Sequence, residues 1–341
     1  MKAPTRTLLA ISLVGLVASP WAGAGTRAVP DTMLAAALDH GGGPEVLSIH
    51  HLPTPKPKAG QVLIKLHAAG VAVWEAAFRQ HPGKLARFPL VLGSDSAGTI
   101  AAIGPGVHGF RLGDAVYGIG NGTYAEYATA RAQNVARIPK GIGFAQAGIL
   151  AISGLSALQG IDDVLQLKRG ETLIIHGAAG GVGTLAIQFA NLRGVRVLAT
   201  ATSDEELARL ERLGADAVVN GRTGDIAAAA KRFAPSGVDA VLGLAGGDAL
   251  ERCIDAVRHD GRGRVAYLYG IEPVPKPRGN LRMTLYSFVA GKAELERLNK
   301  AVEAAKLQVP IAAQYPLAAA AEAHKRLEAG HLFGKIVLLV Q

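Results

Sequence analysis

The rhythm of hydrophobic and polar positions changes near residue 150. Between about residue 33 and that point, short apolar and β-branched runs alternate with turn residues, a pattern typical of strands buried on one face. Breakers rich in proline or glycine separate the runs at 53–57 and 104–106. This spacing predicts a twisted barrel or sandwich rather than βαβ repeats. The expected strands are 34–38, 46–49, 61–67, 97–103, 115–117, 124–130 and 136–138.

After residue 150, strand-like and helix-like segments alternate. Leu207, Leu210 and Leu213 lie on one face of a helix that ends at Gly214. Such alternation predicts a mostly parallel sheet that helices cover on both faces. The expected strands are 172–175, 195–200, 217–219, 238–244 and 264–269, and the other expected helices are 184–192, 225–233 and 248–258.

The last part of the chain mixes both kinds of element. The segment 271–279 contains too much proline for regular structure. A polar helix is expected at 293–305. A strand at 309–314, an alanine-rich helix at 317–329 and a strand at 335–340 are expected to follow it.

One stretch, from Glu171 to Gly183, joins an apolar strand to a glycine-rich turn that opens a helix. In a G-x-G-x-x-G turn, the first small residue permits the bend, the second lets the backbone approach a pyrophosphate, and the third lets helix and strand pack closely. Ala178, Gly180 and Gly183 occupy these places. Because strand, helix and next strand fill about 30 residues, we interpret the stretch as a dinucleotide site. The alternative is an ordinary tight turn of another α/β protein.

Composition narrows the class of protein. A chain of 341 residues, 49% hydrophobic and 18% charged, fits about two folded domains. The net charge of +9 comes from scattered lysines and arginines, which suit an anionic cofactor but do not indicate a nucleic-acid partner. Cys253 is the one cysteine, so no internal disulfide and no multi-cysteine zinc site can form. We expect it to be a buried, inert thiol on the helix 248–258.

The N-terminus has the layout of a secretory signal peptide. Basic residues precede an apolar run over 8–18, and an A-x-A cleavage site follows at 22–24. The run is shorter than the about 20 residues of a membrane-spanning helix. A signal peptide over 1–24 predicts export to the periplasm or outside the cell, without a stable membrane anchor. The alternative is translation from Met33, which makes the protein cytoplasmic.

Several short motifs occur in a fixed order from Met33 onward. They are GGPEVL at 42–47, GSDSAG at 93–98, GDAVYG at 113–118, GTYAEY at 122–127, GAAGGVG at 177–183, LGAD at 213–216, AEAH at 321–324 and GKIV at 334–337. In this order they resemble the medium-chain dehydrogenase/reductase superfamily, and most closely its zinc-free quinone oxidoreductase branch. The resemblance implies an α/β fold with a GroES-like β-barrel catalytic domain over 33–150. It also implies a Rossmann domain with a doubly wound parallel sheet over 151–290, a return to the barrel over 291–341, and an active site between the domains.

The resemblance bears on zinc. Catalytic zinc needs three protein ligands drawn from cysteine, histidine and carboxylate. Zinc-dependent relatives carry Gly-His-Glu where this chain has Gly93-Ser94-Asp95, and their other cysteine ligands are missing here. We therefore predict an enzyme without zinc.

The choice of nicotinamide cofactor depends on the end of the second Rossmann strand, where a carboxylate that binds the ribose 2′-OH favours NAD. By resemblance that place falls on Ala201, so we predict NADPH over NADH, with the 2′-phosphate beside Thr202 and Ser203 and with Arg222 as the nearest cation. Two features oppose this. Ser203 opens a capping box and has helix capping as its alternative role, and the acidic pair at 204–205 repels a phosphate. A solvated surface arginine is the alternative for Arg222.

Further cofactor residues follow from the resemblance. Ser153 is expected beside the nicotinamide ring, and two strand ends are expected along its path, where a doubly wound sheet binds its ligand. The glycine turn supplies Ala178, Ala179, Gly180, Gly181, Val182 and Gly183. The strand ends supply Leu244, Ala245, Leu268, Tyr269 and Gly270.

The expected substrate wall departs from the family pattern. Relatives commonly have Asn-Pro-x-Asp where Ala72-Val73-Trp74-Glu75 stands here. Trp74 is a candidate for stacking on a flat quinone ring, with a core or domain-interface aromatic as the alternative. Tyr124 is a candidate proton donor to a reduced oxygen, with packing inside the barrel as the alternative. Gly243-Leu-Ala-Gly246 replaces the Asp-Thr-Val-Gly of many relatives, which removes a carboxylate and a hydroxyl beside the cofactor.

Hydride transfer is the work of the nicotinamide and needs no protein base. Our main hypothesis is an NADPH-dependent, zinc-independent reductase of quinones or carbonyl-conjugated alkenes that acts on a small-molecule substrate. One alternative is an enoyl-thioester reductase, which a basic groove for coenzyme A phosphates would support. Another is a non-catalytic NADPH-binding protein of the same fold. Relatives are commonly dimers or tetramers, so the resemblance leaves a homodimer and a tetramer open as oligomeric states.

Overall fold

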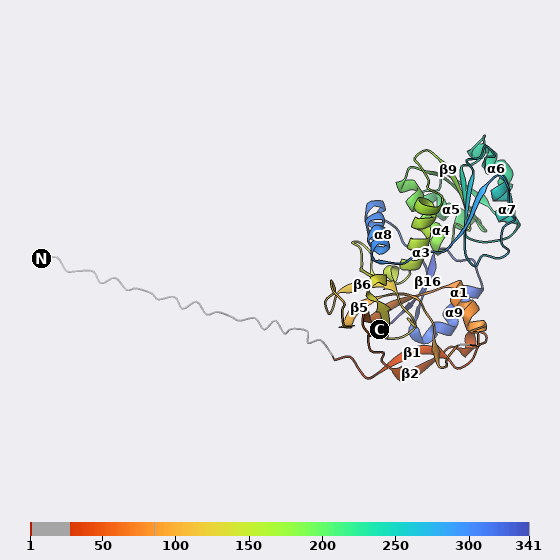
Figure 1. The fold of residues 1–341 in the computed structure, drawn as a ribbon. Coiled ribbons are helices and arrows are strands. Elements are labelled where there is room, and N and C mark those ends of the chain that lie inside the picture. The colour runs from red at the N-terminus through yellow and green to blue at the C-terminus, as the bar shows by residue number, and fades with distance from the viewer. Residues whose placement is uncertain (2–27, 85, 341) are drawn as a thin grey trace.

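A computed structural model of the protein describes Met1 and residues 28–84 and 86–340. Two lobes stand one above the other, with the barrel below and the Rossmann sheet above (Figure 1). Apart from Met1, the predicted signal peptide at 1–24 lies outside the described residues. Across the described part of the chain, helices are too short or too polar to cross a bilayer.

The lower lobe is built around β3 (Gln61–Val71), whose residues are buried at most positions because other strands flank it. It pairs antiparallel with β5 (Asp95–Ile103), β7 (Tyr127–Arg131) and β16 (Lys335–Leu339). The same sheet contains β6 (Ala115–Ile119), β8 (Val135–Arg137) and β15 (Ile311–Pro316). A smaller sheet contains β1 (Thr32–Leu38), β2 (Ser48–Pro53) and β4 (Leu90–Val91), and short 3-10 turns are η1 (Pro44–Val46), η2 (Ala132–Asn134) and η4 (Leu317–Ala319).

The predicted GroES-like barrel is confirmed, and most expected strands lie within two or three residues of the observed ones. The strand expected at 46–49 is divided, because η1 ends at Val46 and β2 starts at Ser48. A helix in this lobe has no counterpart in the prediction, and neither does the short strand β4. The chain forms helix α1 (Val73–Gln80) directly after β3.

The upper lobe is a parallel sheet in the order β11-β10-β9-β12-β13-β14, which confirms the Rossmann prediction. Its strands are β9 (Thr172–His176), β10 (Arg196–Ala201), β11 (Ala217–Asn220), β12 (Ala240–Gly243), β13 (Arg264–Leu268) and β14 (Arg282–Tyr286). The order reverses between β9 and β12, so a crevice for a ligand is expected at the carboxyl ends of these strands.

Both faces of this sheet are covered, as the alternating pattern predicts. Ile174 faces one core together with α6 (Ile226–Phe233) and α7 (Asp248–Asp255). Its neighbour Ile175 faces the other core, because successive strand residues point to opposite faces. The helices that contribute to the second core are α3 (Ala151–Gln159), α4 (Gly181–Leu192), α5 (Asp204–Arg212) and α8 (Lys292–Ala305).

The chain crosses between the lobes more than once. Within 291–341, predicted as the return to the barrel, α8 packs against α3 and α4 with Leu295, Leu298 and Val302 buried, and it also contacts β8 of the barrel. The chain re-enters the barrel with β15, α9 (Ala320–Glu328) and β16. The remaining short helices are α2 (Phe144–Ala147) and the π-helical η3 (Gly160–Val164).

Cys253 lies on α7 with its side chain fully buried, so the expected burial is confirmed. Burial raises the pKa of its thiol to about 12. The thiolate is the reactive form of cysteine, so the folded protein holds this thiol in its unreactive form.

We therefore predict that the native protein does not react with an aromatic disulfide reagent near neutral pH. The same protein unfolded in guanidinium chloride should release one equivalent of thiolate, in agreement with its single cysteine. Fast reaction of the native protein would show that Cys253 is accessible.

Candidate functional site

The glycine turn has the geometry that its sequence predicts. Gly177 follows β9 with a φ of 77°, a value that favours glycine. The backbone N–H of Ala178 donates to the carbonyl of Thr200 at 3.0 Å, which fixes the turn against β10. A Cβ on Gly183 would lie 2.5 Å from Cα of Ala178, so only glycine permits this approach of helix and strand. The turn therefore packs as a dinucleotide fingerprint requires.

The start of α4 leaves its donors available. Gly180 is the N-cap residue, and no side chain of the described residues bonds to the helix end there. A Cβ on Gly180 would meet only the carbonyl oxygen of Gly177, at 3.7 Å, so the space above the turn is open. The first N–H groups of a helix lack intrahelical partners and suit a phosphate. The residues present thus fit the pyrophosphate of a dinucleotide.

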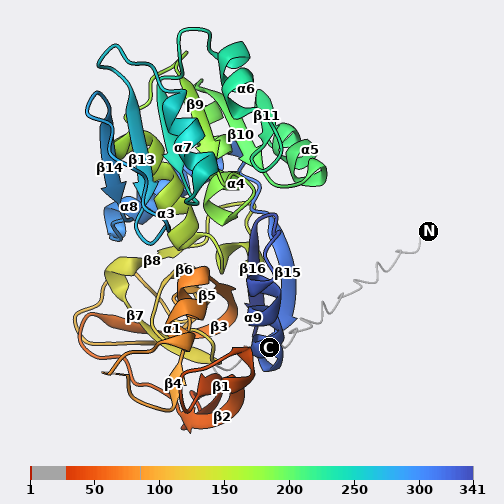
Figure 2. The same ribbon diagram turned by 90° about the vertical axis from the view of Figure 1, so that its right-hand side faces the viewer.

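The barrel touches this turn directly. Gly334, which precedes β16, donates its N–H to the carbonyl of Ala179 at 2.8 Å and forms a bridge with Gly180. The C-terminal strand therefore begins at the cofactor turn and runs into the barrel (Figure 2). This joins the two domains at the predicted site.

The other residues predicted by resemblance lie around the same edge of the sheet. A Cβ on Gly181 would lie 3.2 Å from Oγ of Ser153, and one on Gly177 would lie 3.3 Å from Cβ of Ala245. Leu244 and Ala245 follow β12, Leu268 ends β13, and Tyr269 and Gly270 follow it. Tyr269 is 77% exposed and donates its N–H to Tyr286 at 2.8 Å. Their contact with a cofactor stays a prediction.

Two of the predicted 2′-phosphate residues, Thr202 and Ser203, are already hydrogen-bonded to Glu206. Oγ of Ser203 accepts from the N–H of Glu206 at 3.3 Å, so its alternative role as a helix cap is confirmed. One carboxylate oxygen of Glu206 accepts from the N–H and the hydroxyl of Thr202, at 2.9 and 3.0 Å. These donors are therefore shared with a buried acid, and a phosphate needs cations from elsewhere.

Two basic residues lie in the surroundings of Thr202. Nδ1 of His331 lies 3.1 Å from its hydroxyl. Arg222 has an exposed side chain and lies in the turn after β11, where Nδ2 of Asn220 donates to the carbonyl of Thr202 at 3.5 Å. The sequence did not predict His331 as part of this region, because it follows Thr202 by 129 residues.

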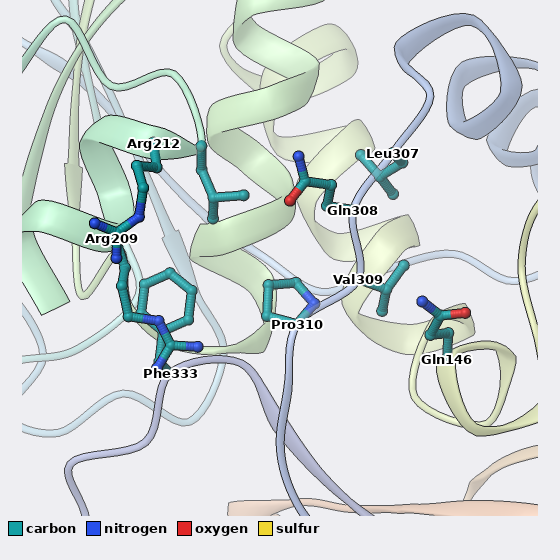
Figure 3. A pocket seen from close by; sticks show the side chains of 9 residues that line it. Gln146, Arg209, Arg212, Leu307, Gln308, Val309, Pro310 and Phe333 are labelled. Atoms are coloured by element: carbon teal, nitrogen blue, oxygen red, sulfur yellow. The ribbon is translucent and has the colours of Figure 1, made fainter.

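A hollow of about 630 Å³ lies near this region but on other residues (Figure 3). Arg209 and Arg212 of α5 line it, and the guanidinium of Arg209 stands 3.8 Å from the ring centroid of Phe333. Its lining includes none of the predicted cofactor residues. It is therefore separate from the candidate site.

Lys335 connects the glycine turn to the predicted substrate wall. A Cβ on Gly181 would stand 3.4 Å from Cβ of Lys335. The lysine ammonium donates to the Asp95 carboxylate and lies 5.3 Å from the ring centroid of Trp74. The other oxygen of Asp95 accepts from the N–H of Ile152, beside Ser153, at 2.9 Å. Both charged residues lie within the family motifs, but the sequence alone indicated no role for either.

Trp74 is 44% exposed, so its side chain does not lie in the core. Tyr124 is fully buried in the barrel, which matches its packing alternative. Its hydroxyl donates to Oε2 of Glu75 at 2.7 Å and lies 3.2 Å from Nε2 of His324. Burial raises the pKa of Glu75 to about 7 and that of Tyr124 well above its usual value. Burial also lowers the pKa of His324 to about 4.

Zinc ligands do not gather in the described residues, where no three histidine, cysteine or acidic side chains lie at metal-binding spacing. Asp95, at the place of the family's acidic residue, is held by Lys335 and Ile152 instead. The absence of zinc stays a prediction.

Comparison with known proteins gives the family. The sequence model of the alcohol dehydrogenase GroES-like domain matches residues 58–140, and that of the zinc-binding dehydrogenases matches 213–338. The quinone oxidoreductase of Homo sapiens is 33% identical over 326 residues, which cover 90% of this chain and 98% of that protein. The chain belongs to the medium-chain dehydrogenase/reductase superfamily. Within it, the chain lies in the quinone oxidoreductase-like branch.

Two further members of the superfamily are similar along their whole length. The 2-haloacrylate reductase of a Burkholderia species is 28% identical and covers 91% of this chain and 99% of that protein. A mycobacterial protein whose structure was solved in complex with NADPH is 31% identical, with a TM-score of 0.81. It covers 90% of this chain and 100% of its own.

We predict that Glu75 makes stability depend on pH. Its pKa is about 7 in the folded protein against an ordinary 4.5, so the folded state binds more protons between these values and stability falls as pH rises through them. Replacing Glu75 with glutamine removes this cost. From about pH 5 to about pH 8, the stability of Glu75→Gln relative to wild type should improve by about 2 kcal/mol.

Urea unfolding at both pH values measures this change, and Glu322→Gln, which alters an exposed carboxylate, is the control. A stability difference between Glu75→Gln and wild type that stays constant with pH would contradict the buried ionisation.

Proposed function

We propose that the protein is an NADPH-dependent, zinc-independent reductase of quinones or carbonyl-conjugated alkenes. One observation carries the proposal. The stem of Lys335 packs on the uncapped glycine turn, while its ammonium lies 5.3 Å from the half-exposed ring of Trp74. The candidate dinucleotide turn and the flat ring of Trp74 therefore lie next to one lysine side chain, which supports a shared site.

The relatives support the same chemistry. Human quinone oxidoreductase and the Burkholderia 2-haloacrylate reductase are named for reductions of these two substrate types. The similar mycobacterial structure holds NADPH. Both conjugated alkenes and quinones accept a hydride at carbon and pass its negative charge to oxygen, so one site suits both.

The chain's own residues supply binding and orientation. N–H groups at Gly181 and Val182 are placed to bind the pyrophosphate, and Ser153 borders the place expected for the nicotinamide ring. When bound, NADPH supplies a hydride, and a proton taken up with it completes the reduction. Trp74 offers a flat surface for a conjugated ring. Lys335 and Asp95 connect the surroundings of this wall with those of the turn.

We predict that NADPH binds more tightly than NADH because Arg222 and His331 lie near the expected place of the 2′-phosphate. Arg222→Ala and His331→Ala should each raise the Kd for NADPH about tenfold, the size of one lost charged hydrogen bond, and leave the Kd for NADH nearly unchanged. Titration of the bound cofactor's fluorescence measures both constants.

Arg232→Ala is the matched control. Arg232 is an exposed arginine in the last turn of α6, at the end of the helix that is far from the cofactor edge of the sheet. Equal affinity of the wild-type protein for NADH and NADPH would contradict the proposed preference.

We predict that the NADPH complex is oxidised on mixing with benzoquinones or alkenals in a stopped-flow instrument.

Gly183→Val should bind NADPH at least about tenfold more weakly, because its side chain collides with the backbone of Ala178. Circular dichroism checks that this variant is folded. NADPH binding by the wild-type protein without oxidation by any acceptor would show a non-catalytic binding protein instead.

A further inference from the structure

Helix α1 carries its charged residues inward and its apolar residues outward. Glu75, Ala76 and Arg79 are buried, whereas Val73 is 68% exposed and Phe78 is 46% exposed. An ordinary surface helix turns its apolar stripe to the core. This helix is reversed, which is also why the hydrophobic pattern did not predict it.

Charged hydrogen bonds fix the reversed orientation. Oε2 of Glu75 accepts from the N–H of Ala72 at 2.9 Å and from Tyr124 at 2.7 Å. Nη2 of Arg79, a fully buried side chain, donates to Glu328 on α9 at 2.5 Å. Turning the apolar side inward would expose these bonds to water and break them. The outward apolar face is therefore specified by the packing of the helix.

The outward residues form one continuous strip. Val73 and Ala77 are four residues apart, as are Trp74 and Phe78, so all four side chains project from the same side of the helix. None of them carries a charge. Connected apolar surface of this kind on a soluble protein marks a binding site.

The strip begins at the candidate active site. Trp74, its first aromatic residue, lies 5.3 Å from the ammonium of Lys335, and the stem of that lysine packs against the cofactor turn. Figure 2 shows α1 on the side of the barrel that faces the Rossmann domain. A molecule whose reactive ring lies at Trp74 therefore has an apolar path outward to Phe78.

We propose that the outward strip of α1, made by Val73, Trp74, Ala77 and Phe78, binds the apolar tail of the substrate. This inference rests on the proposed reductase function and narrows its substrate to lipophilic quinones or enones with an alkyl chain or second ring beyond the reacting group. The lack of charge on the strip disfavours the phosphate groups of a coenzyme A thioester.

Two benzoquinones with identical ring substituents, one with a methyl and one with a decyl side chain, test the proposal. With the full chain and saturating NADPH, kcat/KM should be at least about tenfold higher for the decyl quinone, kept below its micelle-forming concentration. The double variant Val73→Ser with Phe78→Ser, here called the α1 variant, should reduce that ratio to about twofold or less, because both side chains contact the tail.

Leu112→Ser is the matched control, since Leu112 is 55% exposed on a loop of the barrel outside α1. It should leave the ratio at the wild-type value. Equal kcat/KM values for the two quinones in the wild type, or an unchanged ratio in the α1 variant, would overturn the inference and leave the reductase function intact.

A binding measurement separates failure of the inference from failure of the function. Quinones quench tryptophan fluorescence. The difference in quenching between the wild type and Trp74→Phe gives the part that comes from Trp74. If the decyl quinone quenches at a lower concentration than the methyl quinone, and the α1 variant loses this difference, the result supports the tail site even when no NADPH is oxidised. Equal quenching by both quinones overturns it.

Sedimentation tests the other occupants of the strip. Wild-type protein that sediments with phosphatidylcholine vesicles, or that self-associates with rising concentration, overturns the inference if the α1 variant loses that behaviour. The strip would then be a membrane or subunit contact instead of a substrate site.

Discussion

The buried ion pair between Lys335 and Asp95 holds the candidate site together. It joins β16 to β5 inside the barrel, and the second oxygen of Asp95 binds the start of α3 beside Ser153. Removing one partner of a buried pair leaves an uncompensated charge and typically costs about 3–5 kcal/mol. The pair is in contact with three parts of the site, because Lys335 lies beside Gly181 and Trp74 while Asp95 accepts a hydrogen bond from the start of α3.

Recognition of the nucleotide is shared between distant parts of the chain. The pyrophosphate turn is local, since Gly177 to Gly183 contain its bend, its open space and its close contact with β9. The 2′-phosphate region is not local. Glu206 occupies the donors of Thr202, and the neighbouring imidazole comes from His331 in the segment that returns to the barrel. The candidate 2′-phosphate region therefore includes a residue from the segment that returns to the barrel.

The sequence predicts those parts of the fold that depend on periodicity. Alternating strands and helices between 172 and 268 appear where expected, because each strand lies between two covered faces. β14 was missed, since Arg282–Tyr286 is a short edge strand without a clear apolar pattern. α1 was missed because its buried side is charged. Its partners lie far away in the sequence, with Glu328 following Arg79 by 249 residues.

The same distinction applies to the site. Motifs identified the turn, Ser153 and the strand ends, whereas Lys335, Glu75 and His331 gain their roles only from partners elsewhere in the chain. The central claim is that one cleft holds NADPH on the glycine turn and substrate on Trp74. A crystal structure with NADPH and a decyl quinone tests it directly. We expect the pyrophosphate at the N–H groups of Gly181 and Val182, with the quinone ring on Trp74. A dinucleotide bound away from this turn, or a quinone outside the cleft, would contradict the account.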